Sequence, residues 1–240
     1  MVTDKNGELL LPSGAETFHS VQIRTGRQWS DVLPKNRRKR MNADKNGELL
    51  LPSGGYRRLK SFQLTRLIYD ITVHFAELYI PMASRTRDQM VQAARSGVQN
   101  IAEGSVDAAT SVKMELNLYN VARASLEELR LDYEDYLRQH NEPIWQKDSP
   151  LYSEFIARRI ADKTGFRTFI HWAETSFPSV QIRSIPYKSV LVANATLLLI
   201  ETAVYFLKRQ IASKSKTFLD NGGFSERMAR MRKKNQKGFL

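Results

Sequence analysis

From Ser61 onward, apolar residues recur at steps of three and four, and this period constrains the fold more than any other feature of the chain. The first such run extends from Phe62 to Tyr79. Steps of three and four place side chains on one face of an α-helix, whereas a half-buried strand alternates every two residues. We find no convincing strand pattern along the chain. The sequence therefore predicts an all-α fold.

The period and its interruptions predict four long helices, at about residues 61–80, 85–103, 111–139 and 187–219. Pro81 ends the first helix, because proline disfavours helical backbone in the residue before it. Ser84 and Thr110 are candidate N-caps, and Gly104 and Asn221–Gly223 are candidate stops. The interpretation places Leu78 in the apolar seam of the first helix, and Met114 and Val121 in that of the third.

The connections predict how the helices are arranged. Short loops separate the first three helices, so we expect them to be antiparallel neighbours in an up-and-down four-helix bundle. Residues 141–186 are too many for a plain connector and should pack on the bundle as an inserted helical segment. Within them we predict one short helix with Phe155, Ile156 and Ile160 inward, and leave 166–186 unassigned. The apolar run 189–207 contains Asn194, Thr196, Glu201 and Thr202, which favours a buried bundle helix over a membrane span.

Basic residues are concentrated in the two flanks of the chain. Residues 1–60 carry 12 Lys or Arg against 6 Asp or Glu, residues 208–240 carry 10 against 2, and residues 61–207 carry 15 against 17. The net charge of +12 therefore belongs to the flanks, around a nearly neutral middle. Such flanks can bind polyanions by neutralising phosphates, or they can act as solubilising tails.

An eleven-residue sequence, DKNGELLLPSG, occurs at 4–14 and again at 44–54. The second copy leads directly into the first helical period, whereas the first copy leads into a segment with no sustained period. We therefore expect 1–54 to be a disordered or extended leader, with Met1–Arg40 dispensable for the fold. The bundle should cover 55–222. A basic tail, helical at most in part, should cover 223–240.

Two motifs resemble those of a known family. The segment DQMVQAARSGVQNIAEGS at 88–105 carries Asn-Ile-Ala-Glu-Gly, and the segment at 116–137 carries Ser-Leu-Glu-Glu-Leu. In this order they are similar to motifs of the four-helix-bundle family named after the 23S ribosomal RNA intervening-sequence proteins. The segment 206–232 resembles the variant of that family with a C-terminal suffix helix. The resemblance implies structural roles for the matched positions Gln89, Ser96, Asn100, Glu103, Gly104, Ser125, Glu127 and Glu128.

The resemblance also implies an assembly and a partner. Members form compact bundles, and the better-studied ones assemble into pentameric barrels. One relative, the accessory protein of diversity-generating retroelements, binds nucleic acid and partners a reverse transcriptase. We therefore expect a homo-oligomer, a pentamer by resemblance, that binds RNA or DNA. Many relatives carry an Arg-Arg pair where this chain has Val91 and Gln92, so its bundle surface should be less basic.

The basic residues favoured for phosphate contact lie in both flanks and on two helices. Arginine suits this role because its guanidinium presents a fixed fork of donors. The candidates are Arg57, Arg58, Lys60, Arg95, Arg123, Arg227, Arg230, Arg232, Lys233 and Lys234.

Asn100 and Glu103 share one face near the end of the second helix. We favour a structural role, in which Asn100 bonds the third helix and Glu103 pairs with an arginine such as Arg95 or Arg123. A polar contact site at the mouth of an oligomer is the alternative.

Motifs for catalysis and metal binding are missing from the sequence. There is no cysteine, which excludes disulfides and thiol chemistry and fits a cytoplasmic protein. No Gly-rich phosphate loop or nucleophile elbow is present. His74 with Glu77, and His171 with Glu174, have the reverse order of the Glu-x-x-His pairs in di-metal bundles. We therefore expect no catalytic residue, metal or cofactor.

Five acidic residues lie close together in the third predicted helix. The cluster is predicted to be a solvated face or one that meets basic residues on a neighbour; it consists of Glu127, Glu128, Asp132, Glu134 and Asp135. The favoured function is a non-enzymatic, homo-oligomeric bundle that binds nucleic acid through its flanks, as an accessory to a reverse transcriptase. A protein-interaction scaffold of the same fold is the alternative. An enzyme would need an inward cluster of carboxylates.

Overall fold

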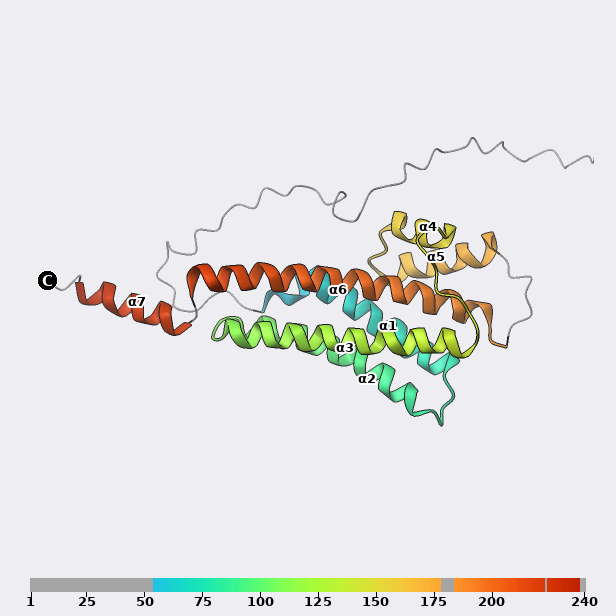
Figure 1. Ribbon diagram of the computed structural model, residues 1–240, viewed down its shortest axis with the longest axis horizontal. Coiled ribbons are helices and arrows are strands. Elements are labelled where there is room, and N and C mark those ends of the chain that lie inside the picture. Colours follow the sequence, from blue (N-terminus) through green and yellow to red (C-terminus); the bar gives the residue numbers. More distant parts are fainter. Residues whose placement is uncertain (1–53, 178–183, 223, 238–240) are drawn as a thin grey trace, which may run out of the picture. The chain divides into compact units, whose positions relative to one another are not determined.

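The structure, a computed structural model, describes residues 54–177, 184–222 and 224–237 (Figure 1). All of them belong to the second of the two units into which the chain divides, Gly47–Leu240. The described residues form seven α-helices and one short 3-10 helix, and they contain no strand. The predicted all-α class is confirmed. The predicted leader lies outside the described residues except for Gly54.

The helices follow the predicted order, and α4 is the short helix predicted in the insertion; η2, α5 and α7 are additions. Their bounds are η2 Gly55–Arg58, α1 Lys60–Tyr79, α2 Arg85–Asp107, α3 Val112–Gln139, α4 Pro150–Arg158, α5 Lys163–Ser176, α6 Tyr187–Asn221 and α7 Phe224–Lys237. Asp162 caps α5, since its carboxylate accepts a hydrogen bond from the Gly165 N–H at 2.8 Å. Gly222 ends α6 with φ +71°, a backbone region that glycine adopts without strain.

Gly104 lies inside α2, so its predicted role as the end of the helix is wrong. The helix continues to Asp107. A Cβ atom at Gly104 would lie 2.9 Å from Tyr119 Cε1 and 3.2 Å from the Glu115 carbonyl oxygen. Glycine at this position therefore permits α3 to approach α2 closely. The N-cap of α3 is also corrected, because Ser111 and not Thr110 accepts the Met114 N–H, at 3.2 Å.

Four helices pack side by side in pairs: α1 with α2, α2 with α3, α3 with α6 and α6 with α1 (Figure 1). Ile68, Met90, Leu126 and Ile200, one from each of these helices, are fully buried. Burial of such side chains is the main favourable term in folding. These four helices therefore enclose one apolar core.

The inserted helices are held to the core by packing and by two ion pairs. α5 packs on α6, and α4 packs on α5. Lys163 Nζ lies 3.0 Å from Asp70 Oδ2 of α1, and Lys188 Nζ of α6 lies 3.1 Å from Glu174 Oε2 of α5. The predicted inward positions Phe155 and Ile160 are buried, and Ile156 is partly buried. The segment left unassigned contains α5.

α6 is long and apolar enough to cross a membrane by length and composition, but 72% of its most apolar window is buried inside the protein. Its polar side chains in this region form hydrogen bonds. Asn194 accepts the Trp145 N–H at 2.8 Å and donates to the Val190 carbonyl at 3.1 Å, while Thr196 donates to the Val192 carbonyl at 2.7 Å. In this structure α6 packs as a core helix.

Three residues predicted for the core are exposed. Leu78 is 71% exposed, and Met114 and Val121 are each 47% exposed. Leu78 is exposed although Ala76 and Ile80 on either side of it are buried, so it faces away from the core. Met114 and Val121 lie on a face of α3 that no described helix covers. The helical period identifies apolar residues but not which faces of a helix its neighbours cover.

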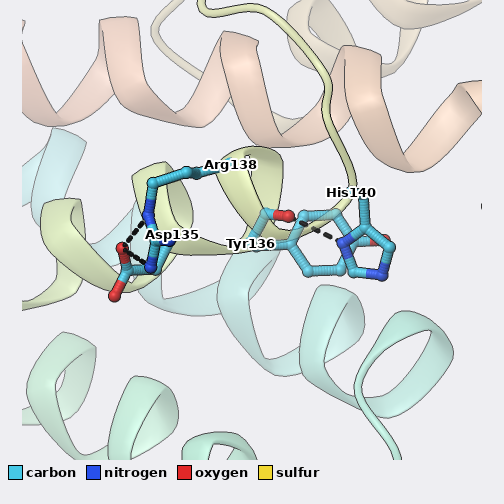
Figure 2. Close-up of polar contacts among 4 residues, drawn as sticks. All are labelled: Asp135, Tyr136, Arg138 and His140. Carbon is cyan, nitrogen blue, oxygen red and sulfur yellow. Dashed lines mark hydrogen bonds and ion pairs between the residues drawn. The ribbon is translucent and has the colours of Figure 1, made fainter.

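The last turn of α3 is closed by local polar contacts (Figure 2). His140 Nδ1 lies 2.7 Å from the Tyr136 carbonyl oxygen. Because the carbonyl can only accept, Nδ1 carries the proton and donates. Arg138 donates to Asp135 Oδ1 at 2.9 and 3.0 Å. The Tyr136 hydroxyl in turn donates to Ser189 Oγ at 2.9 Å, which joins the end of α3 to the start of α6.

Candidate nucleic-acid interface

The described residues of the first basic flank lie beside the second half of α6, at one end of the helical unit. Ser61 Oγ, in the first turn of α1, donates to Gln210 Oε1 in the second half of α6 at 2.7 Å, although 149 positions separate them. Lys60 precedes Ser61, and Arg209 precedes Gln210. We call this region the basic end and define it by Arg57, Arg58, Lys60, Lys208, Arg209, Lys214 and Lys216. All of these side chains are exposed except that of Lys214, which is partly buried.

A buried carboxylate lies beneath the basic end. Glu115, in the first turn of α3, is 1% exposed, and its Oε1 accepts from Lys214 Nζ at 2.8 Å and from the Tyr119 hydroxyl at 2.9 Å. Burial, and then the Glu115 carboxylate, raise the pKa of Tyr119, so the phenol stays neutral and donates. These contacts fix the second half of α6 against the start of α3.

The charge at the basic end is positive but not uniform. Glu103 and Asp107 lie in the last turns of α2, on either side of Ser105, whose carbonyl accepts the Gly54 N–H at 3.0 Å. Together with Glu115 they oppose the seven basic residues. Positive charge therefore exceeds negative charge at this end, where a phosphate backbone could be neutralised.

Arg95 and Arg123 lie apart from the basic end. Arg95 is exposed on α2, and Arg123 is partly buried on α3. Within the described ranges, neither forms an ion pair with Glu103, so the predicted pairing of Glu103 with one of these arginines is wrong. Glu103 instead projects into solvent. Arg95 and Arg123 therefore do not belong to the basic end.

Asn100 makes its contacts within α2, which corrects its predicted bond to the third helix. Its Nδ2 donates to the Ser96 carbonyl at 2.9 Å and lies 3.1 Å from Ser96 Oγ. Ser96 Oγ lies 2.9 Å from Ser125 Oγ of α3. The polar link between the two helices is thus the serine pair, and Asn100 holds Ser96 in place.

The remaining motif positions lie along the same junction of α2 and α3. A hollow of about 390 Å³ is lined by Asp88, Gln89, Gln92, Ala93, Ser96 and Glu128. Glu127 lies beside it and pairs with Arg130, with 2.9 Å between Oε2 and Nε. The two motifs found in the sequence therefore meet in space at this helix junction.

The C-terminal basic segment is a helix over Phe224–Lys237, more fully helical than predicted. Arg230, Arg232 and Lys233 are exposed, and Met228 and Met231 are partly buried. The side chains of Arg227 and Lys234 lie outside the described residues. α7 therefore presents basic side chains on a helical frame.

The two histidine–glutamate pairs noted in the sequence do not come together in one site. His74 Nδ1 lies 3.5 Å from Glu77 Oε2 in an exposed pair, while Glu174 pairs with Lys188. Across the part of the chain that the structure describes, no group of three or more His, Asp or Glu side chains could hold a metal ion.

Sequence reasoning missed Lys208, Arg209, Lys214 and Lys216 as members of the basic end. The charge of residues 208–240 was the signal for them, but only the Ser61–Gln210 contact brings them beside Lys60. Comparison with known proteins finds no matching family, no matching curated protein and no matching solved structure.

Proposed function

We propose that this protein is a non-enzymatic, self-associating helical protein of the cytoplasm that binds RNA or DNA through the basic end and α7. It acts as an accessory to a reverse transcriptase, in keeping with its resemblance to the 23S ribosomal RNA intervening-sequence protein family. The observation that supports this proposal most directly is the Ser61–Gln210 hydrogen bond, which brings Lys60 of one flank close to Arg209 of the other.

The contacts expected from this arrangement are electrostatic. The basic end offers exposed Lys and Arg side chains from η2, α1 and α6, and α7 adds Arg232 and Lys233. Each phosphate neutralised by such a residue releases a counterion, so the affinity falls steeply with salt and depends little on base sequence. We therefore propose backbone recognition of nucleic acid.

We further propose that α1, α2, α3 and α6 form an antiparallel, up-and-down four-helix bundle with α4 and α5 as its insertion. Two contacts between α3 and α6 support this topology. Glu115 pairs with Lys214, and Tyr136 bonds Ser189, so positions rise along α3 as they fall along α6. The pentamer remains a proposal from the family resemblance.

A protein-interaction scaffold is the second candidate function, because α3 exposes apolar side chains. Met114, Val121 and Leu131 are 47%, 47% and 58% exposed. These three side chains lie at spacings of seven and ten residues along α3, and exposed apolar surface on one face of a helix favours protein interaction. This function predicts capture of a protein partner and no salt-dependent binding of nucleic acid.

Binding of labelled, mixed-sequence single-stranded RNA and DNA over a salt series tests the proposal. The full chain should bind with an affinity that falls linearly with salt on logarithmic axes. Deleting Arg227–Leu240 should lower the slope by about 0.7 for each phosphate that the shortened chain no longer neutralises. R95A/R123A serves as the matched comparison, and its slope should stay close to that of the full chain.

An unchanged slope after the deletion would remove α7 from the interface. If the full chain bound neither polymer at low salt, the nucleic-acid function would be wrong and the scaffold would take its place.

A further inference from the structure

The outward face of α3 carries a regular seam. Its residues are spaced three and four apart and all are exposed: Met114, Asn117, Val121, Ala124, Glu128, Leu131 and Asp135. This alternation keeps side chains on the line along which a second helix packs in a coiled coil. We call these seven residues the α3 seam. No described helix covers it, so its apolar members remain in contact with solvent.

The second half of the α3 seam is acidic, and its charge is only partly compensated. Asp135 pairs with Arg138 at 2.9 Å (Figure 2). Within the described part of the chain, Glu128 and its neighbour Asp132 have no ion-pair partner. Burial, and then repulsion by Glu128 and Asp135, raise the pKa of Asp132 to about 6.

The surroundings add more negative charge. Asp88 of α2 lines the same hollow as Glu128. Arg130, the nearest basic residue along α3, pairs with Glu127 and lies 3.7 Å from Glu134. A cationic partner at Glu128 and Asp132 would therefore relieve repulsion that the chain itself leaves in place.

α7 has the complementary chemistry. Met228 and Met231 are three residues apart and so share a helical face. Exposed Arg232, four residues after Met228, shares this face, and exposed Lys233 follows it. α7 does not pack extensively on any other described helix. Its apolar and basic groups match the apolar and acidic parts of the α3 seam.

The α7 of the same chain cannot reach the acidic part of the seam. The Glu115–Lys214 pair aligns α3 with α6, and α6 continues past Lys214 to Asn221, about 10 Å beyond that pair. If α7 folded back along α3, Arg232 would return only to about the level of Glu115. Glu128 lies about 20 Å further along α3. Contact with Glu128 therefore requires another molecule.

We propose that the α3 seam binds α7 of a second copy of this chain. The methionines of α7 cover Leu131, and Arg232, next to exposed Lys233, meets Glu128 and Asp132. This inference rests on the self-association in the proposed function and does not depend on nucleic-acid binding.

Sedimentation velocity of the full chain over a concentration series, without nucleic acid, tests the inference. The wild-type protein should associate, and both E128K/D132K and R232E/K233E should raise the dissociation constant at least about tenfold. An equimolar mixture of the two variants should restore association, because the exchanged charges are again complementary. D148K/E201K makes the same change of charge at exposed sites away from the seam and should associate like wild type. Circular dichroism checks that each variant is folded.

A wild-type chain that stays monomeric would overturn both this inference and the proposed self-association. If the wild type associates and E128K/D132K associates equally well, the α3 seam is not the interface, while self-association stands. Failure of the mixture to recover association would also overturn the pairing of the seam with α7.

Discussion

The two ends of the helical unit use different means to hold the same helices together. At one end, which we call the aromatic end, Phe75 lies 4.9 Å from both Tyr133 and Tyr136 and 5.2 Å from Tyr79, between ring centroids. At the basic end, Glu115, Tyr119 and Lys214 form a chain of polar contacts. Packing of aromatic rings holds the helices together at the aromatic end, whereas an ion pair and a hydrogen bond to a carboxylate do so at the basic end.

The hydrogen bonds at the two ends differ in the same way. At the aromatic end, the buried hydroxyl of Tyr133 donates to Thr72 at 3.0 Å and that of Tyr136 to Ser189 at 2.9 Å. At the basic end, Glu115 Oε2 and Gln210 Nε2 are buried and have no hydrogen-bond partner among the described residues. Stability should therefore depend most on the aromatic end, and ligand binding on the basic end.

The largest effect on stability is expected for Phe75→Ala. Phe75 is 1% exposed and contacts three aromatic rings, so its removal leaves a cavity that the rigid rings cannot fill. The free energy of unfolding should fall by about 3–5 kcal/mol. Urea denaturation measures the loss, with F75L as the control that keeps more of the volume. A loss below that of F75L would contradict the account of the aromatic end.

A smaller loss is expected for Gly104→Ala, at the close approach of α2 and α3. The new Cβ would meet Tyr119 and the backbone of Glu115, and a backbone carbonyl cannot easily yield. Overpacking of this kind costs about 1–3 kcal/mol, which exceeds the gain of up to about 1 kcal/mol from replacing a helical glycine. Thermal unfolding measures the change.

Gly97→Ala is the matched control, because its Cβ would meet side-chain atoms of Thr65 and Leu126 at 3.1 and 3.4 Å. Side-chain ends can shift, so this variant should be near neutral. Equal effects at both glycines would show that the Glu115 backbone does not restrict the contact.

The Glu115–Lys214 pair should contribute about 1–2 kcal/mol. The carboxylate is buried, but the Lys214 side chain is 42% exposed, so solvent screens the interaction. A double-mutant cycle with E115Q and K214M measures the coupling, and glutamine keeps an acceptor for Tyr119. The coupling should shrink in high salt. A coupling near zero would mean that the pair does not tie α6 to α3.

The smallest effect is expected for Asp132→Asn, and it should depend on pH. The pKa of Asp132 is raised to about 6 in the folded protein, so the folded state holds a proton that the unfolded state loses between about pH 4 and 6. Stability contributed by this group is therefore lost as the pH rises through that window. Removing the charge should raise Tm at pH 7.5 by about 1–2 °C, and the difference should vanish below pH 4.

Calorimetry in the R232E/K233E background measures this effect, because the seam should then be unoccupied. If Asp132→Asn still raised Tm at pH 4, the stabilisation would have a cause other than removal of the Asp132 charge.

The sequence was most informative where a helical period met a clear cap or stop. The starts of α2 and α6, and the end of α6 at Gly222, were predicted from residue type. The end of α2 was predicted wrongly because glycine can either end a helix or permit close packing within it. Only the position of Tyr119 in the structure shows that Gly104 has the second role. The tail was predicted to be only partly helical, since its charge obscured the helical period of α7.

The candidate site was less accessible to sequence reasoning than the fold. The charge of the flanks was plain, but the contact between Ser61 and Gln210 depends on how α1 packs on α6. Burial of Glu115 could not be foreseen, because a lone carboxylate in a first helical turn is usually solvated. Met114 and Val121 are exposed because they lie on a face of α3 that no described helix covers, and the period of one helix does not show which faces its neighbours cover.

The most direct test of the account compares charge reversals at the basic end and away from it. R57E/R58E/K60E alters the basic end, and K147E/R159E/R167E makes the same change of charge at exposed residues elsewhere. The salt dependence of RNA and DNA binding is measured for both variants. We predict that the first lowers the slope by about 2–3 and leaves Tm unchanged, while the second leaves both close to wild type. Equal slopes for the two variants would contradict the assignment of nucleic-acid binding to the basic end.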